Sequence, residues 1–374
     1  MPHKTPIQKL LPLNLDTGAL LDWYDASART LPWRVGPAAR GGGMRPDPYR
    51  VWLSEVMLQQ TTVAAVVEYY LHFTRRWPSV GDLAEAPLDD VLGAWAGLGY
   101  YARARNLHAC ARAVATRLGG VFPQSSAELM TLPGIGPYTA AAIAAICHDE
   151  KVPVLDGNVE RVLARVLALN VPVRDAKPQL CAALSTRVPE RAGDFAQAMM
   201  DLGATLCAPR RALCDRCPLS GGCRAFGAGR PLDFPVKPTR AQRPTRHGHA
   251  FVIVNNDGAV WLRQRPDKGL LASMTEVPGS TWDETPTPPA GPLAADWRPA
   301  GHVTHVFTHF RLELDVWAAR SDEAPASEGW WASPREVARA ALPSLYRKVL
   351  AVAGVGQDKA QKKTAGHKDR RSLN

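Results

Sequence analysis

Four of the seven cysteines in this 374-residue chain fall within seventeen positions, and this crowding constrains the fold more than any other feature. They are Cys207, Cys214, Cys217 and Cys223, separated by six, two and five residues. Small secreted domains use such clusters to form disulfides, but a chain of this length can bury a core without covalent cross-links. Neighbouring thiolates in a reducing cytosol instead indicate a metal centre.

Two kinds of metal centre are compatible with the four cysteines. Tetrahedral zinc is usually held by two CxxC pairs, whereas a cubane iron–sulfur cluster needs four cysteines and accepts uneven gaps. The segment contains a single CxxC pair, Cys214 with Cys217. The spacing therefore favours iron–sulfur over zinc, and zinc stays open as the alternative.

Length and charge set broad limits on the chain. The length predicts two domains, and the formal net charge of +10 is compatible with a polyanionic partner. Residues 354–374 are rich in Lys and are expected to form a disordered basic tail. Residues 1–15 hold no apolar run long enough for a signal peptide or membrane anchor. We therefore expect a cytoplasmic chain without a membrane segment.

Residues 15–225 are expected to form an almost entirely helical domain. Apolar residues recur there at helical spacing, and Pro and Gly separate the helical stretches. The stretches are 51–70, 88–118, 127–147, 159–169 and 179–184. Within this domain, the segment 37–48 (PAARGGGMRPDP) is expected to be a flexible loop.

A second domain is expected over residues 248–353, after a stiff, basic and proline-rich linker over 226–247. Apolar and polar residues alternate over 249–255 and 259–264 around Asn256-Asp257-Gly258, which predicts a β-hairpin. Further strands are expected at 301–308 and 311–318, and a helix at 334–341. This pattern is typical of an α+β domain.

A glycine-rich turn, residues 132–136 (LPGIG), connects two helical stretches. Gly134 and Gly136 let the backbone approach a partner closely, and the amide groups that open the next helix suit a DNA phosphate. Such a turn by itself is more often only a tight connection. Asp156 follows twenty residues after Gly136 and is placed to cap a helix. A carboxylate held in this way stays ionised and can also face an electron-poor centre.

The glycine turn, Asp156 and the cysteine segment together resemble the helix–hairpin–helix superfamily of DNA glycosylases. Residues 54–61 (SEVMLQQT) and 97–107 (GLGYYARARNL) narrow the resemblance to adenine DNA glycosylases of the MutY type. The resemblance implies a monofunctional base-excision-repair enzyme that hydrolyses the N-glycosidic bond of adenine mispaired with 8-oxoguanine or guanine. It also implies a 4Fe–4S cluster on the four cysteines and a bacterial, nucleoid-associated location.

Glycosidic cleavage uses one protonated and one ionised carboxyl group in different environments. Glu55 lies among apolar residues, so its pKa should be raised if it faces a base pocket, and it matches the general acid of the family. A helical glutamate is more often solvent-exposed, and the motif match is what favours catalysis. Asp156 matches the residue that supports the cationic sugar, and Asn158 and Tyr138 match residues of the pocket.

Tyr138 stands where bifunctional relatives of the endonuclease III type have a lysine. A phenol cannot form a Schiff base, so we expect base removal without strand cleavage. Gln60 and Tyr100 match the residues that enter the duplex when adenine is flipped out. For Tyr100 alone, core packing would be the more common role. Arg103 and Arg105 are interpreted as surface charges.

The second domain resembles the Nudix-like domain that recognises 8-oxoguanine in this family. The recognition turn corresponds to Phe307, Thr308 and His309, with threonine where the family has serine. Met274 stands where many relatives have an aromatic residue. The segment around Gly269 lacks the glutamates that bind magnesium in Nudix hydrolases, so nucleotide hydrolysis is not expected.

The expected partner is double-stranded DNA with an A:8-oxoguanine or A:G mispair, bound by a monomer. Two alternatives stay open: a pyrimidine-lesion glycosylase and lyase of the endonuclease III type, and a non-catalytic protein that binds DNA lesions. Tyr138 and the additional domain argue against the first alternative. The intact pair of Glu55 and Asp156 argues against the second.

Overall fold

A computed structural model of the chain describes residues 12–237, 243–266, 269–340 and 342–355. The described chain divides into two compact units. The first holds residues 12–91 and 103–237, and the second holds residues 92–102 together with the residues from 243 onward. The expected basic tail from residue 356 and residues 238–242 of the expected linker lie outside the described residues.

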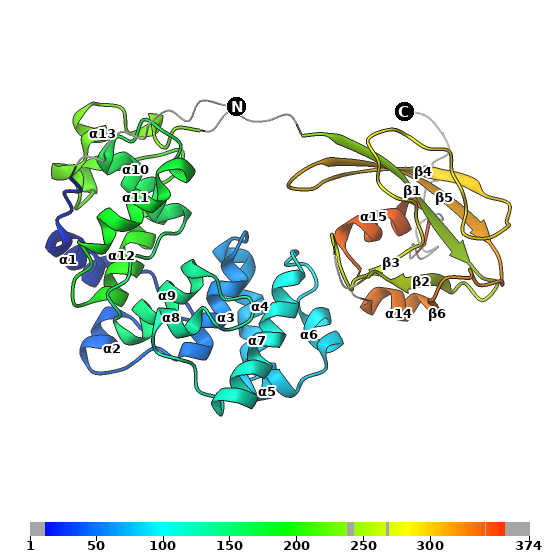
Figure 1. Cartoon of the computed structure of the whole chain (residues 1–374), viewed down its shortest axis with the longest axis horizontal. Helices are drawn as coiled ribbons and strands as arrows, with labels where there is room; N and C mark the ends of the chain where they lie inside the picture. Colours follow the sequence, from blue (N-terminus) through cyan, green and yellow to red (C-terminus); the bar gives the residue numbers. More distant parts are fainter. Residues whose placement is uncertain (1–11, 238–242, 267–268, 341, 356–374) are drawn as a thin grey trace, which may run out of the picture. The chain divides into compact units, whose positions relative to one another are not determined.

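The first unit is built of helices, drawn from blue to green in Figure 1. The helices are α1 Thr17–Ser27, α2 Pro37–Gly41, α3 Pro48–Leu58, α4 Val63–Arg76, α5 Val80–Glu85, α7 Ala102–Leu118, α8 Ser126–Leu129, α9 Pro137–His148, α10 Gly157–Leu167, α11 Val173–Ser185, α12 Ala192–Thr205 and α13 Arg224–Gly227. The helix α6, Leu88–Ala94, contains the boundary between the two units. Short 3-10 turns lie at Cys214–Arg216, Ser220–Gly222 and Pro231–Asp233. The expected all-helical character of this unit is confirmed.

Two of the expected helical stretches are interrupted. The stretch 51–70 divides where Gln60 adopts a left-handed backbone with φ of 58°, so α3 ends at Leu58 and α4 begins at Val63. The stretch 88–118 divides between α6 and α7, where Tyr100 has a φ of 49°. A right-handed helix cannot continue through left-handed backbone, and apolar spacing does not reveal such a residue.

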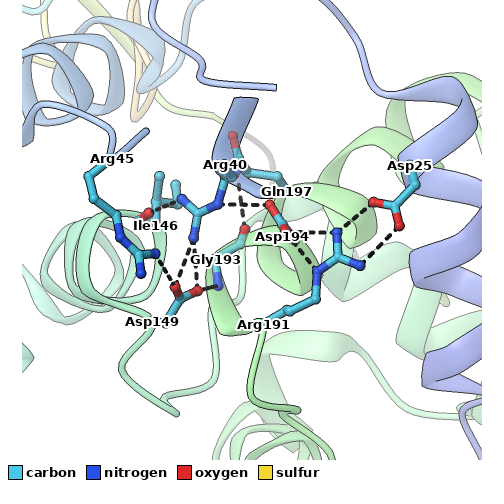
Figure 2. A network of polar contacts seen from close by, with 9 residues as sticks. All are labelled: Asp25, Arg40, Arg45, Ile146, Asp149, Arg191, Gly193, Asp194 and Gln197. Atoms are coloured by element: carbon cyan, nitrogen blue, oxygen red, sulfur yellow. Dashed lines mark hydrogen bonds and ion pairs between the residues drawn. The ribbon is translucent and has the colours of Figure 1, made fainter. Parts of the chain in front are cut away.

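The expectation of a flexible loop over 37–48 is wrong for its first part, which forms α2. Arg40 on this helix is buried, with 8% of its surface exposed. It donates to the carbonyl oxygen of Ile146 at 2.6 Å and pairs with the carboxylates of Asp149 and Asp194 (Figure 2). Buried charges persist when they are paired and hydrogen-bonded. The segment is therefore fastened to the ends of α9 and α12.

The helix α9 lies at the centre of this unit. Its sequence, PYTAAAIAAICH, is apolar almost all round, and it packs against α3, α8 and α12. A Cβ atom on Gly193, at the start of α12, would lie only 2.6 Å from the carbonyl oxygen of Ala145. The same helix α12 packs against α10, where a Cβ on Gly203 would lie 2.6 Å from the Cβ of Asn158. Close packing thus holds α12 against the C-terminal part of α9 and against the N-terminal end of α10.

The second unit contains a mixed sheet and two helices. Its elements are β1 Thr245–Val254, β2 Val260–Gln264, β3 Thr275–Glu276, β4 Arg298–Val306, β5 Arg311–Arg320, β6 Trp330–Ala332, α14 Pro334–Arg339 and α15 Ser344–Val352. The strand order is β3-β2-β1-β5-β4, and β6 pairs with β2. The strands β1 and β5 are parallel, and the other pairs are antiparallel.

The sequence predicted most of these elements. The hairpin of β1 and β2 is confirmed, with Val254 paired to Val260, and β4, β5 and α14 are confirmed with slightly different bounds. The helix α15 was not predicted. It packs against β1 and β4 (Figure 1). Leu345, Tyr346, Val349 and Leu350 are its buried residues. Among the described residues, no helix is long and apolar enough to cross a membrane.

Replacing Gly203 by alanine is expected to lower the free energy of unfolding by about 2 kcal/mol, because the added methyl group overlaps Asn158. The matched control is Gly93→Ala on α6, where a Cβ would meet no atom within 4 Å. That variant is expected to be as stable as the wild type or more stable by up to about 1 kcal/mol. Urea unfolding followed by circular dichroism measures both, and equal stabilities would contradict the close packing of α10 and α12.

Candidate active site

Glu55 lies in the last turns of α3, with only 6% of its surface exposed. Its carboxylate accepts a hydrogen bond of 2.7 Å from the hydroxyl of Tyr138, at the first turn of α9. The contact forms because α3 packs directly against α9. The structure therefore brings together two of the residues that the sequence singled out, from segments 83 positions apart.

Burial raises the pKa of Glu55 to about 7. The negative charge of Asp156 raises this pKa further, whereas the hydrogen bond from Tyr138 and the charge of Arg34 lower it. Burial and the neighbouring carboxyl groups also raise the pKa of Tyr138 well above its ordinary value. Near neutral pH the site therefore holds a phenol that keeps its proton and a carboxyl group that can give one up.

Asp156 is the N-cap of α10, as the sequence predicted. One carboxylate oxygen accepts the backbone N–H of Val159 at 2.7 Å, and the other accepts the side-chain amide of Asn158 at 2.9 Å. Two donors from the same helix end hold the carboxylate in one orientation. The cap of α10 therefore leaves open the second role that the sequence suggested for Asp156, that of facing the reacting sugar.

Arg161 orients Asn158 and was not singled out by the sequence. Its guanidinium donates to the side-chain oxygen of Asn158 at 2.8 Å and to the backbone carbonyls of Gly203 at 2.7 Å and Cys207 at 2.8 Å. One side chain thus joins the end of α10 to the start of the cysteine segment. No spacing or motif marks Arg161, because its links to the cysteine segment and to α12 end on backbone carbonyls more than forty positions away.

A cavity lies beside Glu55 and combines apolar walls with two guanidinium groups. It is lined by Glu55 with Arg29, Leu31, Trp33, Arg34, Val51, Ser54, Leu58, Val63, Ile146 and Gln197. The fully buried carboxylate of Asp201 binds Arg29 at 2.7 Å and Arg34 at 2.8 Å. A pocket that combines apolar walls with several fixed polar groups suits a small aromatic ligand that also carries hydrogen-bonding atoms. Only Glu55 among these residues was predicted as a site residue, since most of the others come from segments distant along the chain.

The four clustered cysteines line a single cavity in the first unit, together with apolar residues that include Val162 and Leu206. Arg165, which is 1% exposed, donates to the sulfur of Cys207 at 3.1 Å. Among the residues that the structure describes, no three His, Cys, Asp or Glu side chains converge as they would around one metal ion. The four cysteines therefore share the walls of one cavity without converging on a single point.

The glycine turn has the features expected of a close backbone approach. Gly134 has a φ of 72°, and a Cβ there would lie 2.5 Å from the Cβ of Asn106 on α7. Gly136 caps α9 without a side-chain hydrogen bond, and the space where its Cβ would lie is open. Backbone amide groups at the start of α9 are therefore accessible to an anion.

Gln60 and Tyr100 share an unusual backbone conformation. Both are non-glycine residues with positive φ, and both are exposed, Tyr100 to 54%. Core packing of Tyr100 is therefore excluded. The interpretation of Arg103 as a surface charge is wrong, because its half-buried guanidinium donates to backbone carbonyls at the end of α3. Arg105 is also half-buried.

In the second unit, the predicted recognition turn connects β4 to β5. The backbone N–H of Phe307 donates to the carbonyl of Phe310 at 2.9 Å, and the exposed residues Thr308 and His309 form the tip. The ring of Phe307 stacks on that of Trp282, with centroids 5.7 Å apart. Met274 is completely buried, so this position packs without an aromatic ring.

Comparison with known proteins places both units in families. Residues 53–185 match the HhH-GPD superfamily of base excision DNA repair proteins, and residues 249–352 match the NUDIX domain family. The solved structure of a thermostable thymine-DNA glycosylase is similar to this fold, with a TM-score of 0.50 and 28% sequence identity. That similarity covers 57% of this chain and 95% of the other.

Two curated relatives are similar over most of their length. The adenine DNA glycosylase of Mus musculus is 38% identical over 395 residues, which cover 88% of this chain and 76% of the mouse protein. The adenine DNA glycosylase of Mycobacterium tuberculosis (strain CDC 1551 / Oshkosh) is 40% identical over 259 residues, which cover 67% of this chain and 78% of that protein.

The helical unit with its buried acid therefore defines a base-excision DNA glycosylase of the helix–hairpin–helix superfamily, followed by a Nudix-like domain. The similarity to curated relatives is more specific: the chain belongs to the adenine DNA glycosylase family. It is an enzyme that removes adenine from DNA in base excision repair. This finding confirms the family predicted from the motifs, and it sets aside the pyrimidine-lesion and non-catalytic alternatives.

Tyr138→Phe is expected to raise the pKa of Glu55 above its present value of about 7, because the substitution removes a hydrogen bond that stabilises the carboxylate. Titration of the 13C-labelled Glu55 carboxyl group by NMR, assigned with Glu55→Gln, measures this pKa. The control is Tyr49→Phe, since the Tyr49 hydroxyl bonds the carbonyl of Trp77. An unchanged or lower pKa in the Tyr138 variant would contradict the geometry.

Glu55→Gln is expected to increase stability at alkaline pH. The folded-state pKa of Glu55 lies above the ordinary value of 4.5, so ionising this group destabilises the fold as pH rises from about 4.5 through about 7. The rise in pKa corresponds to about 3 kcal/mol at pH 8 and to almost nothing at pH 4. Urea unfolding at both pH values tests this, and an equal effect at the two would exclude a buried titrating carboxyl group.

Proposed function

We propose that this adenine DNA glycosylase acts on adenine opposite 8-oxoguanine or guanine in double-stranded DNA. We further propose that it is a monomer and that it is monofunctional, leaving an abasic site. The observation that carries the proposed chemistry is the buried carboxyl group of Glu55, with a pKa of about 7, beside a cavity of suitable character.

In the proposed reaction, protonated Glu55 gives its proton to N7 of the flipped adenine. The bond between the base and the sugar then breaks, adenine leaves as a neutral base, and positive charge develops on the sugar. Asp156, held by Val159 and Asn158, stabilises that charge. Water supplies the hydroxyl group that completes the abasic sugar, and its other proton returns to the ionised Glu55. Asn158 and Tyr138 are proposed to orient this water and shield the sugar.

The proposed absence of strand cleavage follows from the groups near Glu55. A lyase needs an amine that attacks the sugar and forms a Schiff base. The corresponding position holds Tyr138, whose raised pKa keeps the phenol protonated. Of the residues that line the cavity, the only cations are Arg29 and Arg34, and a guanidinium is a poor nucleophile.

The contacts to the duplex are proposed to come from three turns: the glycine turn before α9, the turn after α3 and the turn between α6 and α7. Gly134 and Gly136 present the amide groups of α9 to a phosphate, as the accessible start of this helix allows. Gln60 and Tyr100 are proposed to enter the duplex, each from an exposed position in left-handed backbone. Side chains that enter the stack offset part of the cost of flipping a base.

Recognition of 8-oxoguanine is proposed for the turn between β4 and β5. Thr308 and His309 are exposed there and offer hydrogen-bonding groups, while the stacking of Phe307 on Trp282 holds the turn in place. The threonine hydroxyl can make the contact expected of the family's serine, since both side chains present a donor and an acceptor at the same carbon.

We also propose that Cys207, Cys214, Cys217 and Cys223 hold a 4Fe–4S cluster. The residues fit such a group, because all four cysteines line one largely apolar cavity and the buried Arg165 provides a positive charge beside the sulfur of Cys207. The cluster would cross-link this segment and has no part in the proposed bond cleavage. Iron and sulfide analysis of the purified protein tests the assignment, and stoichiometric zinc would contradict it.

Glu55→Gln is expected to slow adenine release about 10²–10⁴-fold, since an amide cannot act as the acid. Single-turnover assays use duplexes with adenine opposite 8-oxoguanine, adenine opposite guanine, and thymine glycol. The wild type should release base from the first two only, at a rate that falls as pH rises above about 7. Gel-shift affinity for the 8-oxoguanine duplex should be retained in the variant.

Three outcomes would contradict the proposal. Full activity of Glu55→Gln would exclude this residue as the acid. Release of thymine glycol, or efficient trapping of a covalent DNA adduct with borohydride, would indicate a lyase. A sedimentation mass of twice the chain would exclude the monomer.

A further inference from the structure

The C-terminal end of α3 is held by a single guanidinium group. The last carbonyl groups of a helix have no partners within it and must find others. The Nη1 atom of Arg103 lies 2.9 Å from the carbonyl oxygens of both Val56 and Met57, and 2.5 Å from that of Gln59. The carbonyl of Leu58 accepts the N–H of Thr61 at 3.2 Å. The turn after α3 is therefore closed by one side chain from α7.

Arginine suits this arrangement, because one terminal nitrogen contacts the carbonyl groups and the other reaches the hydroxyl of Thr61. The carbonyl end of a helix carries partial negative charge, which a cation stabilises. A planar guanidinium can bond several acceptors at once in fixed directions, whereas a lysine presents one compact ammonium group. The Nη2 atom of Arg103 also donates to the hydroxyl of Thr61 at 3.3 Å. Arg103 thus bonds the residues on both sides of Gln60.

Gln60 has a backbone conformation that needs such support. A non-glycine residue in left-handed backbone is less stable than in the right-handed form by roughly 1–2 kcal/mol. It persists where the flanking residues are held by other contacts. Here Gln59 and Thr61 are bonded to Arg103, and the side chain of Gln59 also donates to the hydroxyl of Thr139 on α9 at 3.2 Å.

The same face of α7 also contacts the glycine turn. Arg103 and Asn106 lie three positions apart and therefore on one side of the helix. The Cβ of Asn106 is the atom that a side chain at Gly134 would overlap, and Arg103, Asn106, Gln59 and Gly134 line one small cavity. One helix face therefore sets the turn after α3 and the glycine turn relative to each other.

We propose that Arg103 is a positioning residue, which fixes the backbone of Gln59–Thr61 so that the side chain of Gln60 enters the duplex in one orientation. The inference rests on the proposed function, in which Gln60 fills the space left by the flipped adenine. Arg103 acts through this turn, so its loss weakens extrusion of the base and leaves the acid chemistry of Glu55 unchanged.

The test compares Arg103→Met and Arg103→Lys with Arg112→Met. Arg112 is an exposed residue of α7 nine positions later, on the opposite face of the helix. Single-turnover excision gives the rate, and 2-aminopurine placed beside the target adenine reports unstacking through its fluorescence. The excision rate is measured across pH, because it is expected to fall above about pH 7 as Glu55 ionises. A change in α3 that disturbs Glu55 would move this fall to another pH.

Arg103→Met is expected to lower the excision rate and the unstacking signal about tenfold, the effect of losing charge-assisted hydrogen bonds. Arg112→Met should match the wild type in both quantities. In Arg103→Met, the excision rate should fall at the same pH as in the wild type. Gln60→Ala should cause a similar loss. In the double variant that combines Arg103→Met with Gln60→Ala, the excision rate should lie within about twofold of that of the slower single variant. Both substitutions impair the same step, the entry of the Gln60 side chain into the duplex, so their effects should not multiply.

Other outcomes overturn the inference. If the two losses multiply in the double variant, Arg103 does not act through Gln60. A displaced pH decline would show an effect on Glu55 instead, and wild-type behaviour of Arg103→Met would show no positioning role. If Arg103→Met does not fold, Arg103→Lys takes its place in the same cycle. If the wild type releases no adenine from either mispair, the proposed function fails, and the unstacking signal alone decides the role of Arg103.

Discussion

The geometry of the helical unit depends on how closely other helices can approach α9. Alanines form much of this helix, and Gly193 lets α12 come within contact distance of its backbone. Tyr138 lies in the first turn of α9, and Glu55 lies on the neighbouring α3. Larger side chains in this helix would move α3 outward and separate the two groups, whose hydrogen bond spans 2.7 Å. Close packing is therefore a condition for the chemistry as well as for stability.

Much of this architecture follows from local sequence signals. Apolar spacing predicted the helical unit, and the turn at Asn256-Asp257-Gly258 predicted the first hairpin of the sheet. Some residues of the site could also be predicted from short motifs. Asp156 caps a helix as its position suggested, and Glu55 is buried, as the motif match favoured over the more common exposed glutamate. These features depend on neighbours along the chain, which a sequence displays directly.

The features that the sequence did not reveal depend on partners distant along the chain. The capping of α3 by Arg103, the links from Arg161 and the pairing of Arg40 all end on backbone atoms or carboxylates of other helices. The left-handed backbone at Gln60 and Tyr100 could not be predicted from the sequence for a related reason. Both residue types are compatible with a helix, and only the contacts around each turn select the other conformation.

The pKa of Glu55 has a thermodynamic consequence for the free protein. With a pKa of about 7, both the protonated and the ionised form of Glu55 are populated near neutral pH. A base that accepts a hydrogen bond from Glu55 binds only the first form, so its apparent affinity is reduced by the fraction that is ionised. Linkage is reciprocal, and binding such a base draws a proton from solvent into the site. Nucleobase recognition and proton uptake are therefore one coupled equilibrium.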